Sequence, residues 1–440
     1  MSFMNKLSYS FFELPNKLRV IIYPVKGVRT IAIYAGLLAG GSLEIATNRG
    51  TLHFLEHQLF TVSQSYPTIH HMLLKTQELA LSYNAAVGSL DTRFWFFAPD
   101  IYLKEVIKFI ADVWTRPLFV EENIERSKRI ILSELRGKEE NPEYQYERKL
   151  YTMLFGKDYP YTQEAVGTEE SIQSVTQEKI EDAYKSYIQP QNIVIAIAGN
   201  ADQRETKKYL LEYLSMWKSG KRRLKHPLYP REKIIESFLV HDQPRKQILF
   251  DIAFPVKGYK ERTVKHILTL NMINHMIGGG ILSDLNMIIR EQLGYVYSVG
   301  SRFVTYPYAG AWFVSGSVES ELLPKAVHEI IKILTTIKNN GFSQDRVDRT
   351  KKYLDAQTLM YFSDPREIAY RLWGNVIEDE DILLPNDVIA LARTITPQEI
   401  NQMAHDMIDF SEMKMGLMGN ESLIEKSGIK LLFYSLRDKL

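Results

Sequence analysis

The chain has 440 residues, of which 45% are apolar and 24% are charged, and both proportions are ordinary for a globular protein. Its 54 lysines and arginines almost cancel its 53 aspartates and glutamates, so no overall charge favours nucleic acid or an anionic membrane as a partner. The lack of cysteine excludes disulfides, thiolate zinc ligands and cysteine nucleophiles. No signal peptide or membrane-spanning run is recognisable, which makes a cytoplasmic protein the simplest expectation.

In chain order, the first half predicts strands that alternate with helices. Apolar runs bounded by turn residues predict strands at 17–25, 30–40, 92–100 and 192–200. The run at 92–100 is expected to be a buried strand. Apolar residues at helical spacing predict helices at 48–60, 102–114 and 123–140.

The second half repeats this order after a basic segment. Residues 218–233 hold seven lysines and arginines with few apolar positions. A nucleic-acid patch is one interpretation, but the segment lacks the aromatic platform of single-strand binders, so a solvated linker is favoured. Beyond it, strands are predicted at 247–256 and 310–320, and helices at 267–277 and 326–341. We therefore expect duplicated domains at 1–215 and 235–440, joined by a linker at 216–234.

The segment GTLHFLEHQLF, residues 50–60, contains two of the ten histidines. His53 and His57 are four residues apart, with Glu56 between them, and on a helix these positions share one face. Two neutral imidazoles suit Zn²⁺, and a third ligand from elsewhere would leave one position for a water whose proton Glu56 accepts. Hydrogen-bonded or solvated histidines are the alternative, which fits a lone histidine better than this five-residue pattern.

The order H-x-x-E-H is the inverzincin motif. Further blocks accompany it: GSLE at 41–44, NAAVGSLDTRFWFF at 84–97, FGKDYPYTQEAVGTEESI at 155–172, NIVIAIAGN at 192–200 and GGGILSDLNMIIREQLGYVYSVGS at 278–301. With these blocks the chain resembles the pitrilysin/insulinase zinc peptidases over most of its length. Its size is similar to that of their half-length processing-peptidase branch.

The resemblance implies an α+β fold with two homologous-looking α/β sandwich domains, each a mixed sheet packed with helices, arranged as one half of a clam-shell chamber. It also implies one Zn²⁺ per chain, with Glu134 as the third ligand, 77 residues beyond His57. Glu134 follows Ile130 and Ile131 at helical spacing, so we expect it on the inward apolar edge of its helix.

Substrate-binding residues also follow from the resemblance. The N-terminal domain would contribute a substrate-binding segment, and the C-terminal domain would contribute an arginine and a tyrosine that hold the substrate main chain and the developing oxyanion. The matching positions are Asn84, Ala85, Ala86, Arg290 and Tyr297. Gly294 is expected to stop the helix that carries Arg290, and Tyr295 and Tyr297 are expected to share one strand face.

The chain departs from the family pattern at three places. Ser127 stands where a second glutamate usually precedes the ligand glutamate by seven residues, which affects support of the metal site. Gln58 replaces a common methionine, and we expect no consequence for the chemistry. The usual Gly-Gly before Asn84 is absent, so the local turn is expected to differ.

These patterns predict a zinc endopeptidase that cleaves peptides or unfolded segments inside an enclosed chamber. Assembly as a homodimer is expected, and a heterodimer with a related subunit is the alternative. A non-catalytic scaffold or partner subunit could use the same fold, and a metal-stabilised binding protein would retain zinc without turnover. The complete set of metal-site residues favours the enzyme.

Overall fold

The computed structural model describes residues 9–220, 224, 229, 236–378 and 380–439. They form two compact units. Unit 1 comprises the described residues of Met1–Gly137, Gln163–Pro227 and Leu359–Leu383, and unit 2 comprises those of Lys138–Thr162, Leu228–Thr358 and Leu384–Leu440. Among the described residues, none of the helices combines the length and the apolar character that crossing a bilayer requires.

Unit 1 contains a six-stranded sheet with the order β1-β2-β6-β3-β5-β4. Its strands are β1 (Ser10–Glu13), β2 (Arg19–Pro24), β3 (Thr30–Leu37), β4 (Ser82–Val87), β5 (Thr92–Pro99) and β6 (Ile193–Gly199). Only the pairing of β2 with β6 is parallel. The central strand β6 is buried at every position, as its unbroken apolar sequence predicts.

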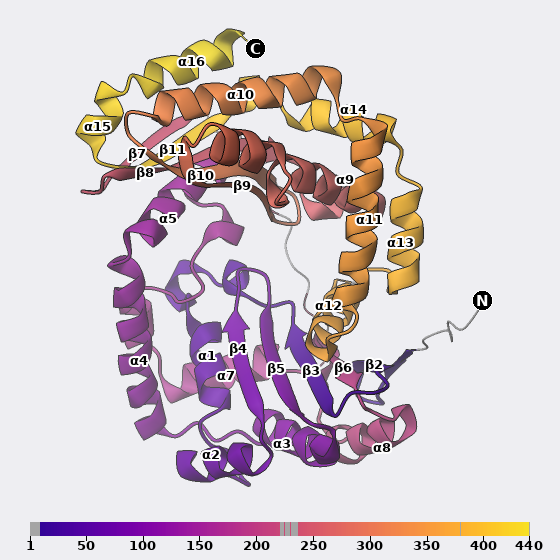
Figure 1. Ribbon diagram of the computed structural model, residues 1–440. Helices are drawn as coiled ribbons and strands as arrows, with labels where there is room; N and C mark the ends of the chain where they lie inside the picture. Colours follow the sequence, from indigo (N-terminus) through magenta and orange to yellow (C-terminus); the bar gives the residue numbers. More distant parts are fainter. Residues whose placement is uncertain (1–8, 221–223, 225–228, 230–235, 379, 440) are drawn as a thin grey trace, which may run out of the picture. The chain divides into compact units, whose positions relative to one another are not determined.

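The helices of unit 1 lie around this sheet (Figure 1). They are α1 (Thr51–Leu59), α2 (Ile69–Glu78), α3 (Leu103–Thr115), α4 (Glu121–Glu139), α6 (Glu169–Gln173), α7 (Gln177–Tyr187), α8 (Gln203–Leu214) and α12 (Pro365–Ile377). The helices α3 and α8 pack together and contact the sheet, whereas α12 contacts β2, β3 and β6. The edge strand β4 contacts α1, the helix that carries the H-x-x-E-H motif.

Unit 2 contains a five-stranded sheet with the order β7-β11-β8-β10-β9. Its strands are β7 (Phe238–Asp242), β8 (Gln247–Val256), β9 (Val296–Thr305), β10 (Gly310–Glu319) and β11 (Lys414–Gly419). Its helices are α5 (Pro142–Phe155), α9 (Val264–Asn274), α10 (Leu323–Asn340), α11 (Gln344–Tyr361), α13 (Pro385–Arg393), α14 (Pro397–Met407), α15 (Glu421–Lys426) and α16 (Ile429–Lys439), with π-helical segments at His275–Gly279 and Leu285–Gln292.

The two sheets have the same topology apart from β1. In each, a parallel pair is followed by three antiparallel neighbours, so β2, β6, β3, β5 and β4 correspond to β7, β11, β8, β10 and β9. Each unit also takes one helix from the other half of the sequence. The helix α12 packs on β2 and β6, and α5 packs on the corresponding strands β7 and β11. This agreement supports the duplication that the weak sequence repeat predicts.

The α+β fold with helix-packed mixed sheets is confirmed, and all the helices and strands predicted above are present. The strand predicted at 92–100 is present as β5, in which buried positions alternate with partly buried ones. The predicted domain boundaries stay a prediction. Residues 221–223, 225–228 and 230–234 of the predicted linker lie outside the described residues.

Candidate metal centre

The helix α1 begins at a tightly constrained turn. Its N-cap residue, Gly50, has a φ of 90°, and a Cβ atom there would lie 2.5 Å from the carbonyl oxygen of Val166. Only glycine accepts both conditions without strain. The buried carboxylate of Glu44 accepts hydrogen bonds from the backbone N–H groups of Gly50, at 2.8 Å, and Leu52, at 2.7 Å. Glu44 therefore satisfies two of the free donors at the start of the helix.

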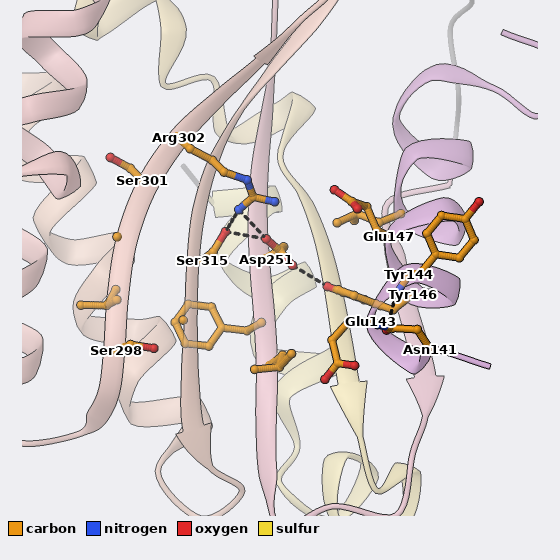
Figure 2. Close-up of a pocket in the computed structure, with 16 residues that line it drawn as sticks. Asn141, Glu143, Tyr144, Tyr146, Glu147, Asp251, Ser298, Ser301, Arg302 and Ser315 are labelled. Atoms are coloured by element: carbon orange, nitrogen blue, oxygen red, sulfur yellow. Dashed lines mark hydrogen bonds and ion pairs between the residues drawn. The ribbon is translucent and has the colours of Figure 1, made fainter. Parts of the chain in front are cut away.

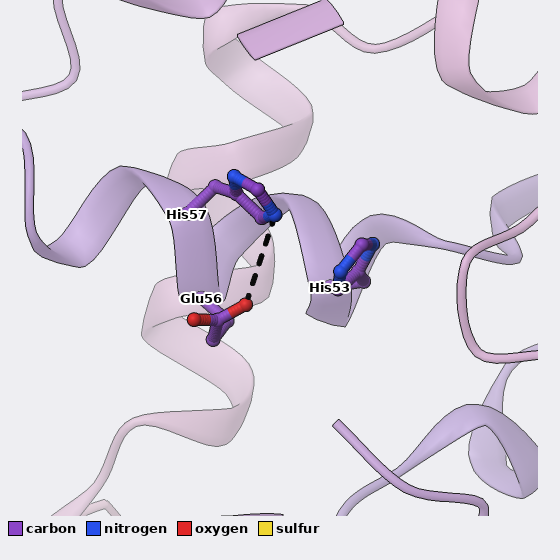
Figure 3. A group of neighbouring side chains, drawn as sticks. All are labelled: His53, Glu56 and His57. Atoms are coloured by element: carbon purple, nitrogen blue, oxygen red, sulfur yellow. Dashed lines mark ion pairs between the residues drawn. The ribbon is translucent and has the colours of Figure 1, made fainter. Parts of the chain in front are cut away.

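The helix α1 places His53, Glu56 and His57 on one face, as the i, i+3, i+4 spacing predicts (Figure 3). Each of the three offers one ligand atom within 4.8 Å of the others. The rings of the two histidines lie 4.8 Å apart between centroids and are almost perpendicular, at 86°. Apolar side chains on the opposite side of the helix, Leu52, Leu55 and Leu59, are buried in the core and fix this orientation.

Glu134 reaches the same place from α4. Its Oε2 atom lies 3.8 Å from Nε2 of His53 and 3.7 Å from Nε2 of His57. The expectation of an inward position is wrong, because the side chain of Glu134 is 42% exposed. The helix α4 buries Ile124, Ser127, Ile131 and Leu135, and Glu134 lies at the border of this stripe rather than within it.

The four side chains fit a zinc ion. Around a tetrahedral zinc with ligand bonds of roughly 2.0–2.2 Å, neighbouring donor atoms lie roughly 3.3–3.6 Å apart. The distances between Glu134 and the two imidazole nitrogens, 3.7 and 3.8 Å, are close to this separation. Two imidazoles and one carboxylate form a three-ligand set of the kind that catalytic zinc sites use, with a fourth position open. His53, His57 and Glu134 could thus hold the metal, with Glu56 beside it.

The electrostatics of the site favour the same assignment. Burial, reinforced by the nearby Glu134 carboxylate, raises the pKa of Glu56 to about 7. Burial lowers the pKa of His57, and the carboxylate of Glu134 opposes this change. A neutral imidazole is the form that binds a metal, and a carboxyl group with a pKa near 7 can both accept and return a proton at neutral pH.

Two of the three expected departures from the family pattern, Gln58 and Ser127, meet in the structure. Nε2 of Gln58 donates a hydrogen bond to Oγ of Ser127 at 2.8 Å, and both residues are buried. The expectation that Gln58 has no consequence took no account of this partner. Sequence reasoning missed it because the two residues are 69 positions apart and on different helices. The available signal was that both positions depart from the pattern that the family resemblance implies.

The predicted substrate segment, Asn84, Ala85 and Ala86, lies on the edge strand β4. Asn84 is exposed, and its side-chain oxygen accepts a hydrogen bond from the N–H of Ala85 at 2.8 Å. Among the described strands, only β5 pairs with β4. The segment therefore has a sheet edge of the kind to which an extended peptide can add, next to the helix α1.

Arg290 and Tyr297 belong to unit 2. The helix of Arg290 stops as predicted, since Gly294 has a φ of 63° and its N–H bonds to the carbonyl of Arg290. Tyr297, 77% exposed, follows the buried Val296. The expectation that Tyr295 shares its strand face is wrong, because β9 begins at Val296 and Tyr295 packs against the hydrophobic core.

A separate pocket of about 700 Å³ lies between α5 and the sheet of unit 2 (Figure 2). At its base the buried carboxylate of Asp251 accepts hydrogen bonds from Tyr146 Oη at 2.8 Å and Ser315 Oγ at 2.5 Å. Nη1 of Arg302 lies 3.4 Å from the same carboxylate. Sequence reasoning did not identify this group, whose members come from four separate elements.

Two family models match the chain. "Insulinase (Peptidase family M16)" matches residues 30–168, and "Peptidase M16 inactive domain" matches residues 174–354. The chain belongs to the M16 peptidase family. The three candidate metal ligands and Glu56 all lie within the first match, whereas the second match has no H-x-x-E-H sequence.

Relatives of this M16 chain are named zinc proteases. An uncharacterized zinc protease of Rickettsia felis is 24% identical over 385 residues, which cover 86% of this chain and 91% of that protein. YmxG of Bacillus subtilis, also named an uncharacterized zinc protease, is 23% identical over 79% of this chain and 83% of its own.

Solved structures show the same fold. A protease from Helicobacter pylori is 15% identical and superposes with a TM-score of 0.83 over 94% of this chain and 99% of that one. The first half of the periplasmic protease PqqL from Escherichia coli is 17% identical. It also superposes with a TM-score of 0.83, over 98% of this chain and 97% of that one. Against complete PqqL, the match covers 50% of that chain.

Proposed function

We propose that the protein is a zinc endopeptidase that cleaves peptides or unfolded segments and binds one Zn²⁺ per chain through His53, His57 and Glu134. The observation that carries this proposal is the meeting of two imidazole nitrogens and a carboxylate from separate helices at 3.7–3.8 Å, with Glu56 on the same face. The names of the relatives, which are zinc proteases, support it.

In the proposed reaction the chain's own residues bind, orient and move protons. A bound zinc ion would polarise the scissile carbonyl and lower the pKa of the attacking water. Glu56 would accept the proton of that water and then donate it to the leaving amine. Because Glu56 is not needed as a ligand, both of its oxygens remain available for proton transfer.

Substrate would add as an extended strand to β4, where Asn84–Ala86 lie. Main-chain hydrogen bonds would hold the peptide, and neighbouring side-chain pockets would select its sequence. We assign Arg290 and Tyr297 to the substrate main chain and the developing oxyanion, because a guanidinium fork and a phenol donate well to a carbonyl oxygen that gains charge. Both side chains are solvent-exposed and can meet a ligand.

The test is a cleavage map. Purified protein is incubated with a peptide library, with and without a metal chelator, and the cut sites are identified by mass spectrometry alongside a metal analysis. Stoichiometric zinc and chelator-sensitive internal cleavage are the expected result. Zinc without any cleavage would overturn the enzyme and favour a metal-stabilised binding protein or scaffold subunit.

We also propose that two copies of the chain assemble into the active particle. The match to one half of PqqL and to half the length of complete PqqL supports a chain that supplies half of a larger enclosure. Light scattering of the active protein should report a homodimer. A strict monomer with full activity would contradict this, and activity that requires a second, related subunit would favour a heterodimer instead.

A further inference from the structure

A buried hydrogen bond joins the two helices that carry the candidate metal ligands. Gln58, in the last turn of α1, is 0% exposed and directly follows His57. Ser127, on α4, is 2% exposed and precedes Glu134 by seven residues. The 2.8 Å bond from Gln58 Nε2 to Ser127 Oγ is therefore a second attachment between α1 and α4, separate from the metal site.

The geometry of α4 explains why this attachment affects the site. Seven residues are almost two helical turns, so Ser127 and Glu134 lie on nearly the same face, roughly 10 Å apart along the axis. Apolar packing of Ile124, Ile131 and Leu135 holds one face of α4, but such contacts are not directional and leave the helix some freedom to slide or rotate. With Ser127 held against Gln58, the height and rotation of Glu134 relative to His53 and His57 are determined before any metal binds.

The hydrogen bond is difficult to replace. The Gln58 amide lies in the protein interior, and its Oε1 atom has no hydrogen-bond partner among the described residues. Its Nε2 atom makes one further contact, a long one of 3.4 Å to the carbonyl of Asn123, also on α4. Loss of the Ser127 hydroxyl would leave a buried amide with little compensation, and α4 would gain freedom to shift.

We propose that Gln58 and Ser127 form a positioning pair that sets the spacing of α1 and α4 and thereby the zinc affinity of the site. This inference rests on the proposed zinc function. Neither side chain is a ligand. The pair acts on the ligands by fixing the positions of the two helices. Gln58 and Ser127 therefore depart from the expected family pattern as one coupled feature and not independently.

The test measures zinc affinity and thermal stability for four variants. They are Gln58→Met, Ser127→Ala, the double variant and Ser127→Thr, which keeps the hydroxyl. Zinc affinity comes from competition with a chromophoric chelator, and the melting temperature is taken on the zinc-free protein. Each of the first two changes should weaken zinc binding about tenfold, the lower end of the loss seen when an outer partner of a metal site is removed.

The zinc affinity of the double variant tests the pair more sharply than the single variants do. Once one partner is absent, removing the other should cost little more, so the double variant should bind zinc about as well as either single variant. Ser127→Thr should stay close to wild type. The matched control is Thr206→Val on α8, which removes a buried hydroxyl that donates to the carbonyl of Asp202. It should lower the melting temperature and leave zinc affinity unchanged.

Two results would overturn the positioning pair. One is wild-type zinc affinity in Gln58→Met and Ser127→Ala together with a melting temperature lowered as in Thr206→Val, because the bond would then be structural only. The other is full additivity in the double variant. A wild-type protein that binds no zinc would instead refute the proposed function itself, so the two failures are distinguishable.

Discussion

Two carboxylates with little solvent exposure, Glu56 in unit 1 and Asp251 in unit 2, lie in polar surroundings but differ in their partners. Asp251 accepts hydrogen bonds from a phenol and a hydroxyl and lies near a guanidinium (Figure 2). Among the described residues, the ion-pair partner of Glu56 is the imidazole of His57, at 3.9 Å, and the like charge of Glu134 raises the pKa of Glu56 further (Figure 3).

This difference separates structure from chemistry. A carboxylate that accepts several hydrogen bonds stabilises the elements that supply the donors. A buried carboxylate without donors costs stability and is retained where a reaction needs its proton affinity. On this argument Glu56 is the reactive group of the molecule, and Asp251 supports the sheet of unit 2.

Glu56→Gln tests the reactive side of the comparison and should have the largest effect. The amide cannot accept a proton, so kcat/KM for a quenched peptide should fall by roughly 10²- to 10⁴-fold, the usual contribution of a general base. Zinc content should stay stoichiometric, because the ligands remain. Turnover at the wild-type rate by a zinc-loaded Glu56→Gln protein would refute the role of Glu56.

Glu134→Ala tests which carboxylate of the site binds the metal. Zinc affinity should fall by more than about a hundredfold, beyond the loss expected from an outer partner. Ser127→Ala, on the same helix, should cost only about tenfold, within that outer range. Chelator competition compares the two variants. Equal affinities would show that Glu134 is no ligand, although it lies within 3.8 Å of both imidazoles.

The sequence predicts the helix α1 and its metal-binding face well, because this prediction depends only on residues close together in the chain. The spacing of His53, Glu56 and His57 determines a shared face once a helix forms, and the apolar period at Leu52, Leu55 and Leu59 predicts that helix. The fold class follows from runs of the same kind. The assignment of Glu134 as the third ligand came from the family resemblance. Its solvent exposure could not be predicted, because the border of a buried stripe depends on the neighbouring helices.

Features that depend on distant partners escape such reasoning. The pairing of Gln58 with Ser127 joins two helices, and the group around Asp251 joins α5 to three strands. The edge strand β4 was not predicted as a strand, since edge positions lack the continuous apolar run that marks a buried strand. The exchange of α5 and α12 between the halves also left no local signal.

Tyr297→Phe extends the test to unit 2. If the phenol donates to the developing oxyanion, its loss should reduce kcat/KM by roughly ten- to a thousandfold, as for other single transition-state donors. Zinc content and melting temperature should not change, because the side chain is 77% exposed and its hydroxyl makes no hydrogen bond within the described residues. Wild-type cleavage by both Tyr297→Phe and Arg290→Ala would exclude this half of the chain from the active site.

Glu44 provides a buried carboxylate between the two extremes, since it accepts two backbone N–H groups but has a pKa raised to about 7, mainly by burial. Because this folded pKa lies above the ordinary value of 4.5, the folded protein binds a proton there more tightly. The stability contributed by the protonated form is present below pH 4.5 and is lost as the pH rises through about 7.

In Glu44→Gln this part of the pH dependence should disappear. The zinc-free wild type should lose on the order of 3 kcal/mol more unfolding free energy over that interval than the variant, at about 1.4 kcal/mol per pKa unit. Urea unfolding at a series of pH values measures the difference, and titration of Glu56 cancels because both proteins contain it. Identical pH profiles would show that Glu44 is ionised in both states at similar pH.

Asp251→Asn closes the comparison with the smallest effect. Burial, and then the Asp251 carboxylate, raise the pKa of Tyr146 well above its usual value, so the phenol is a neutral donor in the wild type. In the variant the new amide N–H can donate to the phenol oxygen, while the remaining carbonyl still faces Ser315 and Arg302. One ionic contact is lost, and the side chain of Arg302 is 45% exposed and therefore screened.

The unfolding free energy of Asp251→Asn should therefore fall by only about 1 kcal/mol, the net value of one hydrogen bond. Zinc affinity should not change, because the ligands lie in the other unit. Urea unfolding measures the stability and chelator titration measures the zinc affinity. Glu56→Gln is the counterpart variant, in which activity should be lost while stability is kept or increased. A large loss of zinc affinity in Asp251→Asn would mean that the satisfied carboxylate also serves the metal centre, and the division between structural and reactive carboxylates would be wrong.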